Sequence, residues 1–174
     1  MNKVFEIIEA KKIFNLDYNK LKILIHSQSY IHAIVKFNNG LTKLLIHDTN
    51  MKIPIFNSLY PNFEKKIKSK KLNISILNNL SLALPNLKKF PIIKILNKLP
   101  SRHSLFETVL VSANDALVDL FLNKKINFED ISKKIFKIAN SREFIKYKHK
   151  EPKNANEINK LADYVSLKIY SRGV

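Results

Sequence analysis

The stretch SLFETVLVSANDALVDLFLN, residues 104–123, carries the longest pattern of a buried helix in this 174-residue chain. Two further helical patterns follow it, at residues 127–140 and at residues 154–173, where an amphipathic helix ends near Gly173. Three successive helices that each have an apolar face to bury must pack against one another. The second half of the chain is therefore predicted to form a helical bundle.

The ends of two helices in this half are marked by residues that favour helix termini. Asn127 followed by Asp130 is a capping pattern, in which side-chain oxygens bond the free amides of the first turn. Further upstream, NLKKFPIIKILNKLP predicts a helix that starts around Phe90-Pro91 and closes before Pro100.

The first half of the chain mixes helical and strand patterns. The opening MNKVFEIIEA places apolar residues at helical spacing, which predicts a helix over residues 3–15. LKILIH, residues 21–26, predicts a short buried strand. The two β-rich runs on either side of Asn38-Asn39-Gly40 predict a hairpin, because Asn and Gly accept the positive φ of a tight turn.

The region after the hairpin has weaker signals. MKIPIFNSLYP predicts a short helix between Pro54 and Pro61. Residues 62–84 are basic and irregular, with a short strand predicted near LNISI, residues 72–76. We expect the lysines over residues 65–71 to form a solvated loop, and a phosphate-binding patch is the alternative.

Together these patterns predict an α+β fold: a small mixed sheet with helices, followed by a C-terminal helical bundle. We expect two domains, over residues 1–84 and 85–174, because the irregular basic segment ends where the helical patterns begin.

The composition excludes several functional classes. The chain has no cysteine, so neither disulfides nor thiolate metal sites can form. Its glycines are Gly40 and Gly173, whereas the Rossmann, P-loop and nucleophile-elbow motifs each need two or more closely spaced glycines. No apolar run reaches membrane-spanning length and no signal-peptide core is present, so a cytoplasmic location without a membrane partner is expected.

The net charge of +17 has two interpretations. A basic excess is typical of proteins that bind nucleic acids or anionic surfaces, but such a footprint is a clustered patch, and lysine here is mostly scattered. A chain rich in Lys, Ile and Asn and poor in Gly and Ala also suits an A/T-biased coding sequence. We favour this compositional bias, and a nucleic-acid partner is the alternative.

Polar residues at the start of the first predicted helix are candidates for binding. The carboxylates of Glu6 and Glu9 suit an oxygen-preferring cation. Asn2 and Lys3 stand beside Glu6, and an amide and an ammonium group suit a phosphate or hydroxyl group. The five histidines form no H-E-x-x-H motif and are more often structural than ligands.

Five segments in order carry a resemblance. MNKVFEIIEAKKIFNL is similar to M-N-K-G-L-E-x-I-E-A-x-x-L-F-N, and ILIHSQSYIHAIVKFNNG to V-x-x-H-P-Q-S-x-I-H-S-x-V-x-x-x-D-G. TNMKIPI, LPNLKKFPIIKI and TVLVSANDALVDLFLNKKINFEDI are similar to P-D-M-R-x-P-I, P-x-x-x-x-F-P-x-x-K-L and T-x-L-N-A-A-N-E-x-x-V-x-x-F-L-x-x-x-I-x-F-x-D-I. These are motifs of the 1-deoxy-D-xylulose 5-phosphate reductoisomerase family, and the chain resembles the C-terminal part of that family over nearly its whole length.

The resemblance implies an oxidoreductase and isomerase of isoprenoid biosynthesis. The family rearranges deoxyxylulose phosphate on a divalent metal ion, Mg²⁺ or Mn²⁺, and reduces the intermediate with NADPH to 2-C-methylerythritol 4-phosphate. Asn2 and Lys3 match the family's substrate-binding pair, and Glu6 matches a metal-ligating carboxylate that also touches the substrate. Lys3 and Glu6 are thus the implied catalytic residues, while His32 and Met51 match active-site positions toward the substrate and the cofactor.

The departures from the family pattern define what else is expected. The family's N-terminal NADPH domain and its two other acidic metal ligands have no counterpart in the chain, so Met1 corresponds to an interior methionine. We expect a fragment, a split-gene product or a decayed remnant, inactive alone and completed by an N-terminal half or in a homodimer. Val4 replaces Gly, Ser27 replaces Pro, Val111 replaces Asn and Asp115 replaces Glu, and these changes affect packing near the site.

Overall fold

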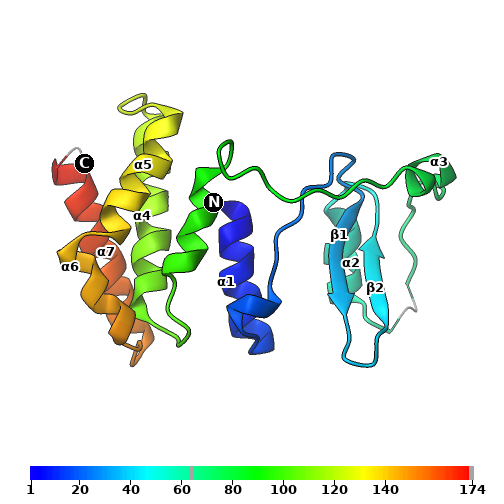
Figure 1. Ribbon diagram of the computed structural model, residues 1–174, viewed down its shortest axis with the longest axis horizontal. Helices are drawn as coiled ribbons and strands as arrows, with labels where there is room; N and C mark the ends of the chain where they lie inside the picture. The colour runs from blue at the N-terminus through cyan, green and yellow to red at the C-terminus, as the bar shows by residue number, and fades with distance from the viewer. Residues whose placement is uncertain (63–64, 173–174) are drawn as a thin grey trace. The chain divides into compact units, whose positions relative to one another are not determined.

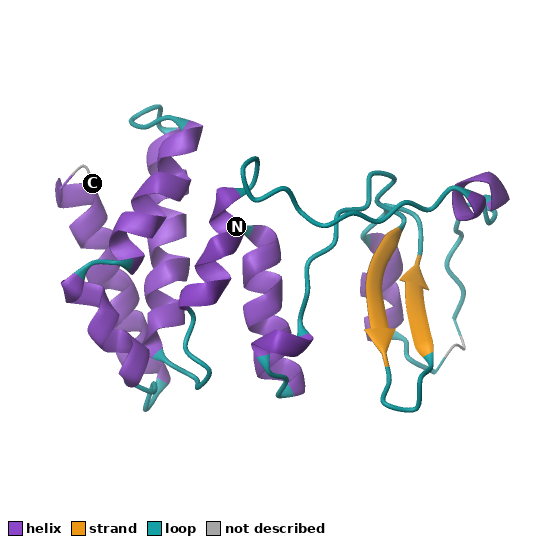
Figure 2. Ribbon diagram, in the orientation of Figure 1, coloured by secondary structure: helices purple, strands orange, loops and turns teal. Residues whose placement is uncertain are grey.

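The computed structural model of the protein describes residues 1–62 and 65–172. Its contacts divide the chain into two units (Figure 1). Unit 1 comprises Met1–Ile23 and the chain from Asn86 onward, and unit 2 is Leu24–Pro85. Unit 1 is helical and unit 2 contains the strands (Figure 2). Within the described part of the chain, no helix has the length and apolar character that crossing a membrane requires.

Helix α4 is the centre of unit 1 and is packed by other elements along its length (Figure 1). The predicted helix over residues 104–123 is confirmed as α4, Leu105–Leu122. Its partners are α5 (Phe128–Ala139), α6 (Arg142–Ile145), the 3₁₀ helix η3 (Lys146–His149) and α7 (Ala155–Arg172).

Helix α4 is central because apolar side chains cover more than one of its faces. Six of them are almost completely buried: Leu105, Phe106, Val109, Leu110, Ala113 and Leu117. A helix that is apolar around most of its circumference is stable only when neighbours surround it. Burial of α4 therefore requires the helices that follow it to fold back around it.

The starts of α4 and α5 are capped by side chains. The amide of Phe106 donates to the hydroxyl of Ser104, and the amide of Ser104 donates to the carboxylate of Glu107. At α5 the amide of Asn127 donates to Asp130, so the predicted capping pattern is confirmed. Each cap satisfies amides that the first turn of a helix leaves without partners.

The N-terminal helix packs with the C-terminal helices. Helix α1, Asn2–Phe14, starts without a side-chain cap and contacts the 3₁₀ helix η2, Pro91–Lys98. Its Val4 and Ile8 enter the same apolar core as α4. The contacts thus group the first 23 residues with the second half, whereas the expected domains divide the chain at residue 84. The assignment of residues 1–84 to the remainder of a catalytic domain stays a prediction.

A buried carboxylate joins α1 to α4. Glu107, only 2% exposed, accepts a hydrogen bond from the hydroxyl of Tyr18 at 3.0 Å and pairs with the ammonium of Lys12 at 3.1 Å. Tyr18 opens the short 3₁₀ helix η1, Tyr18–Lys20, just beyond α1. Burial, followed by the charge of Glu107 and the hydrogen bond to it, raises the pKa of the Tyr18 phenol.

Unit 2 is built on a two-stranded antiparallel sheet. Strands β1 (Ile31–Lys36) and β2 (Thr42–Ile46) pair across a turn in which Gly40 has a φ of +88°. The predicted hairpin is therefore confirmed. The unit also contains the helices α2 (Lys52–Leu59) and α3 (Ile74–Asn78).

Two short strand predictions are wrong. Residues 21–26 form no strand, and in this segment only Ile25 pairs, as an isolated bridge to Ala83. Residues 72–76 contribute to α3 instead, because the side chain of Asn73 accepts a hydrogen bond from the amide of Ile76 and caps a helix.

The remaining differences concern helix type and helix ends. The predicted helix before Pro100 is the 3₁₀ helix η2, and α2 begins at Lys52, two residues before Pro54. The lysine loop over residues 65–71 is confirmed as irregular and mostly exposed. Gly173, where the last helix was expected to end, lies outside the described residues.

We predict that Leu110→Ala destabilises the protein by about 2–5 kcal/mol, because a fully buried leucine leaves a cavity when it is truncated. Leu122→Ala, the same change at a 71%-exposed site of the same helix, should cost far less. Urea unfolding followed by circular dichroism measures both changes. Equal costs would contradict the central position of α4.

We predict that stability falls more steeply above pH 10 in the wild-type protein than in Tyr18→Phe. The pKa of Tyr18 is raised in the folded state above its ordinary value of 10.0, so the folded state keeps this proton where the unfolded state releases it. The contribution of Tyr18 is therefore complete below pH 10 and is lost as the pH rises beyond it. Urea unfolding between pH 8 and pH 11 would show parallel curves for the two proteins if this prediction is wrong.

Candidate functional site

The exposed face of α1 gathers three of the predicted site residues. Glu6 follows Asn2 by four residues and Lys3 by three, so its side chain is a neighbour of both on one side of the helix. All three are exposed, while Val4 and Ile8 on the opposite side are buried in the core. One helix thus presents an amide, an ammonium and a carboxylate together while its other face is fixed by packing.

The ammonium of Lys3 donates to the carboxylate of Glu6 at 2.6 Å. The two side chains are 61% and 52% exposed. An ion pair in this much water contributes about 0–1 kcal/mol. Glu6 can therefore exchange Lys3 for another cation at little cost, and Lys3 can turn to an anionic oxygen.

A divalent cation would find only part of its ligand set here. No cluster of three or more His, Asp or Glu side chains suited to a metal exists within residues 1–62 and 65–172. Glu6 offers one carboxylate and Asn2 beside it one amide oxygen, which are ligand types that Mg²⁺ accepts. Asn2 and Glu6 could thus supply some of the ligands of a divalent ion, and other groups would have to supply the rest.

His32 lies on β1 in unit 2 and is stacked on a second histidine. The rings of His32 and His47 are parallel, with their centroids 3.5 Å apart. A ring nitrogen of His32, Nε2, lies 3.0 Å from the backbone oxygen of His47, and Nδ1 of His47 lies 2.6 Å from that of Asp48. Both rings are thereby held in fixed orientations at the end of the hairpin.

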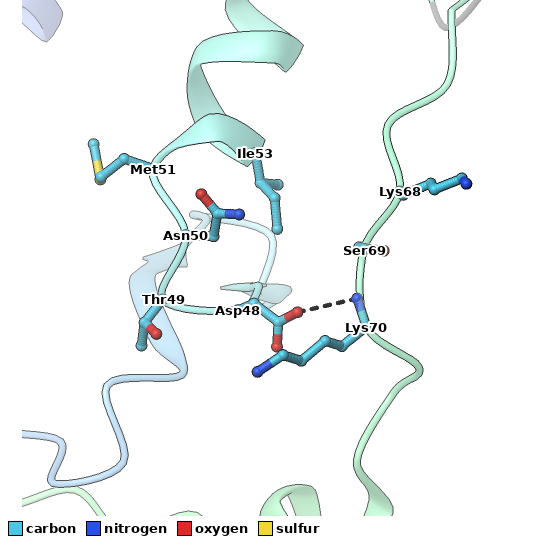
Figure 3. A pocket seen from close by; sticks show the side chains of 8 residues that line it. All are labelled: Asp48, Thr49, Asn50, Met51, Ile53, Lys68, Ser69 and Lys70. Atoms are coloured by element: carbon cyan, nitrogen blue, oxygen red, sulfur yellow. Dashed lines mark hydrogen bonds between the residues drawn. The ribbon is translucent and has the colours of Figure 1, made fainter.

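Met51 lies just before α2, at the edge of an open hollow of about 400 Å³ (Figure 3). Across the hollow, the amide of Lys70 donates to the carboxylate of Asp48 at 3.2 Å. Figure 3 shows the side chain of Met51 turned away from Lys68, Ser69 and Lys70. Met51 is 66% exposed, so most of its apolar surface is open to solvent.

The predicted residues thus form two groups, one in each unit. Asn2, Lys3 and Glu6 share a face of α1, and His32 and Met51 belong to unit 2. The sequence reasoning gave no role to His47 or to Glu107. A regular antiparallel register would not have revealed the first, because it places residue 32 opposite Leu45, and the register shifts between Ile31 and Ala33. The S-x-x-E pattern of Ser104 and Glu107 marks the second as a cap residue, whereas no local signal marks its bonds to Lys12 and Tyr18.

Residues 47–168, well over half of the chain, match the family model of the DXP reductoisomerase C-terminal domain. This chain belongs to the DXP reductoisomerase family. The expected resemblance is therefore confirmed, and the α+β architecture with its C-terminal helices agrees with that of the family.

Relatives in the DXP reductoisomerase family are longer than this chain. The 1-deoxy-D-xylulose 5-phosphate reductoisomerase of Pelagibacter ubique (strain HTCC1062) is 64% identical over 174 residues, which make up 100% of this chain and 45% of that protein. The enzyme of Persephonella marina is 34% identical over 147 residues, 84% of this chain and 39% of its own length. The chain therefore spans less than half the length of these relatives.

Solved structures of the family have the same fold over this region. A DOX-P reductoisomerase with fosmidomycin and magnesium gives a TM-score of 0.82 at 25% identity, covering 98% of this chain and 44% of the other. The enzyme from Zymomonas mobilis in complex with NADPH gives 0.80 at 26% identity, with the same coverage.

We predict that the 174-residue chain by itself binds Mg²⁺ more weakly than about 1 mM, because one carboxylate and one amide are fewer ligands than even weak cation sites use. Isothermal titration of the purified chain with MgCl₂ measures this. Binding in the micromolar range would mean that the described residues form a complete site.

Proposed function

We propose that this chain supplies the C-terminal part of an NADPH- and divalent-metal-dependent reductoisomerase. Its substrate is 1-deoxy-D-xylulose 5-phosphate and its product 2-C-methyl-D-erythritol 4-phosphate, in isoprenoid biosynthesis. The observation that carries the proposal is the exposed Asn2–Lys3–Glu6 face, which presents an amide, an ammonium and a carboxylate on a helix fixed by the core. Family membership and the relatives' names support the reaction.

Each residue of this face has a role that follows from its chemistry. The amide of Asn2 and the ammonium of Lys3 donate hydrogen bonds to hydroxyl or phosphate oxygens of the substrate. Glu6 gives up Lys3 and provides a carboxylate oxygen to the metal, Mg²⁺ or Mn²⁺. The metal, when bound, polarises the ketone and hydroxyl oxygens of the substrate. Lys3 and Glu6 are the proposed catalytic residues of the chain.

Two residues of unit 2, His32 and Met51, are the proposed contacts to the substrate and to the cofactor. His32, with its ring held by the stack on His47, provides a hydrogen-bonding nitrogen for the substrate. Met51 provides an exposed apolar contact for the nicotinamide of NADPH, whose other contacts come from an N-terminal domain. A thioether such as that of Met51 can make an apolar contact without adding charge near the reaction.

The activity needs partners beyond the described chain. An N-terminal half provides the other metal ligands and most of the NADPH site, and the exposed apolar residues of the hairpin, such as Ile34 and Leu45, offer a surface for that half or for a second copy. The proposed location is the cytoplasm. A nucleic-acid partner is not part of the proposal.

We predict that the purified 174-residue chain does not oxidise NADPH in the presence of deoxyxylulose phosphate and Mg²⁺, since it offers one of several acidic ligands that Mg²⁺ needs. Adding an N-terminal half should restore the activity. NADPH oxidation is followed by absorbance at about 340 nm, and turnover by the chain alone would disprove the need for a second part.

We predict that Glu6→Gln in the complete enzyme lowers kcat/KM at least about 100-fold, because a neutral amide replaces a charged metal ligand. Glu129→Gln is the matched control, since this exposed glutamate of α5 also pairs with a lysine, Lys133, at 3.9 Å. The control should keep the wild-type rate. Unchanged activity in Glu6→Gln would refute the proposed ligand.

A further inference from the structure

Glu107 makes more contacts than the cap of α4 requires. The cap uses the bond from the amide of Ser104 to one carboxylate oxygen, at 3.3 Å. The same oxygen also pairs with Lys12, and the second oxygen accepts from Tyr18. Both extra partners come from the end of α1 and the turn after it. A carboxylate that is 2% exposed is costly to bury unless it is paired in this way.

The rest of the α1 contact is apolar and therefore less directional. Val4 and Ile8 pack into the core, and hydrophobic burial depends on area rather than on orientation. Hydrogen bonds, in contrast, weaken steeply when distance or angle changes. Among these contacts, the bonds to Glu107 are the ones most sensitive to rotation of α1 and to sliding along its axis.

The turn after α1 strengthens this attachment. Lys11 is buried, and its ammonium donates to the backbone oxygen of Leu16 at 3.3 Å. The same ammonium lies 4.9 Å from the centre of the Tyr18 ring. Lys11 thus holds Tyr18 against the end of α1. The bonds from Tyr18 and Lys12 to Glu107 therefore attach the same segment, the end of α1 and the turn after it, to α4.

We propose that Glu107 is a positioning residue for the reaction: by holding Lys12 and Tyr18 it sets the rotation and axial position of α1. Asn2, Lys3 and Glu6 lie on the same rigid helix, with Glu6 about 9 Å along the axis from Lys12 at 1.5 Å per residue. A displacement of about 1 Å at reacting groups can cost about 100-fold in rate. The inference rests on the proposed function, because it concerns how that site is held.

The test uses the complete enzyme of the proposed function, this chain together with an N-terminal half, with Tyr18→Phe as the test variant and Tyr170→Phe as the matched control. Each variant loses one hydroxyl that donates to a carboxylate of α4, to Glu107 at 3.0 Å or to Asp119 at 3.1 Å. Tyr18 belongs to the segment that follows α1, whereas Tyr170 lies on α7. Comparison of the two variants therefore distinguishes the loss of a hydrogen bond to α4, which both share, from the loss of the contact that positions α1, which only Tyr18→Phe has.

Two measurements are made on each variant besides the melting temperature. One is the affinity for Mn²⁺ without substrate, followed by electron paramagnetic resonance, and the other is the steady-state kcat and the KM for substrate and Mg²⁺. Tyr18→Phe is expected to weaken Mn²⁺ binding and to lower kcat by about three- to tenfold, a part of the full cost of misplacement. Tyr170→Phe is expected to leave both values within about twofold.

Lys12 provides a second variant pair. Lys12→Met removes the cation that pairs with Glu107 and should reproduce the loss of Mn²⁺ affinity, and Lys12→Arg keeps the cation and should restore it. A role limited to stability predicts a lower melting temperature in Tyr18→Phe with unchanged Mn²⁺ affinity and kcat. That result, or equal effects of Tyr18→Phe and Tyr170→Phe, would overturn the proposal.

The wild-type protein and Glu6→Gln are measured alongside, so that failure of the two proposals can be told apart. An inactive wild-type protein, or an active Glu6→Gln, contradicts the proposed function and the positioning role with it. An active wild-type protein with an inactive Glu6→Gln and an unaffected Tyr18→Phe contradicts the positioning role alone.

Discussion

Burial of α4 on several sides is the constraint on which the rest of unit 1 depends. Side chains such as Phe106 and Leu110 have no exposed surface, and a helix of this kind cannot remain in water. The helices that follow in sequence cover part of it, and α1, which precedes it by about 90 residues, contributes Val4 and Ile8 to the same core. The N-terminal helix therefore belongs to the same folded unit as the C-terminal helices.

In this arrangement α1 has one buried face and one exposed face. One face is apolar and is fixed in the core, and the other presents Asn2, Lys3 and Glu6 to solvent. A binding face is more accurate on a helix that is packed along its length than on a loop. The buried carboxylate of Glu107 adds directional bonds to packing that has few, so the cap of α4 and the attachment of α1 share one residue.

The success of the sequence predictions follows from the range of the interactions involved. The hairpin, α4 and the cap at Asn127 were predicted because each is decided by residues near one another in the chain. The strand predicted over residues 21–26 failed because a strand needs a partner, and only Ile25 has one, at Ala83. The strand near residue 74 failed because Asn73 caps a helix there, a local bond that outweighs a weak β preference.

The sequence by itself determined the family, the helical second half, the hairpin and the residues Asn2, Lys3 and Glu6 as neighbours on one helix face. These depend on residue order and helical periodicity, which are local properties. Only the tertiary structure decided that α1 joins the C-terminal helices and that Glu107 bonds to Tyr18 across 89 positions of sequence. A contact of that range depends on which helices enclose α4, and no spacing in the chain encodes it.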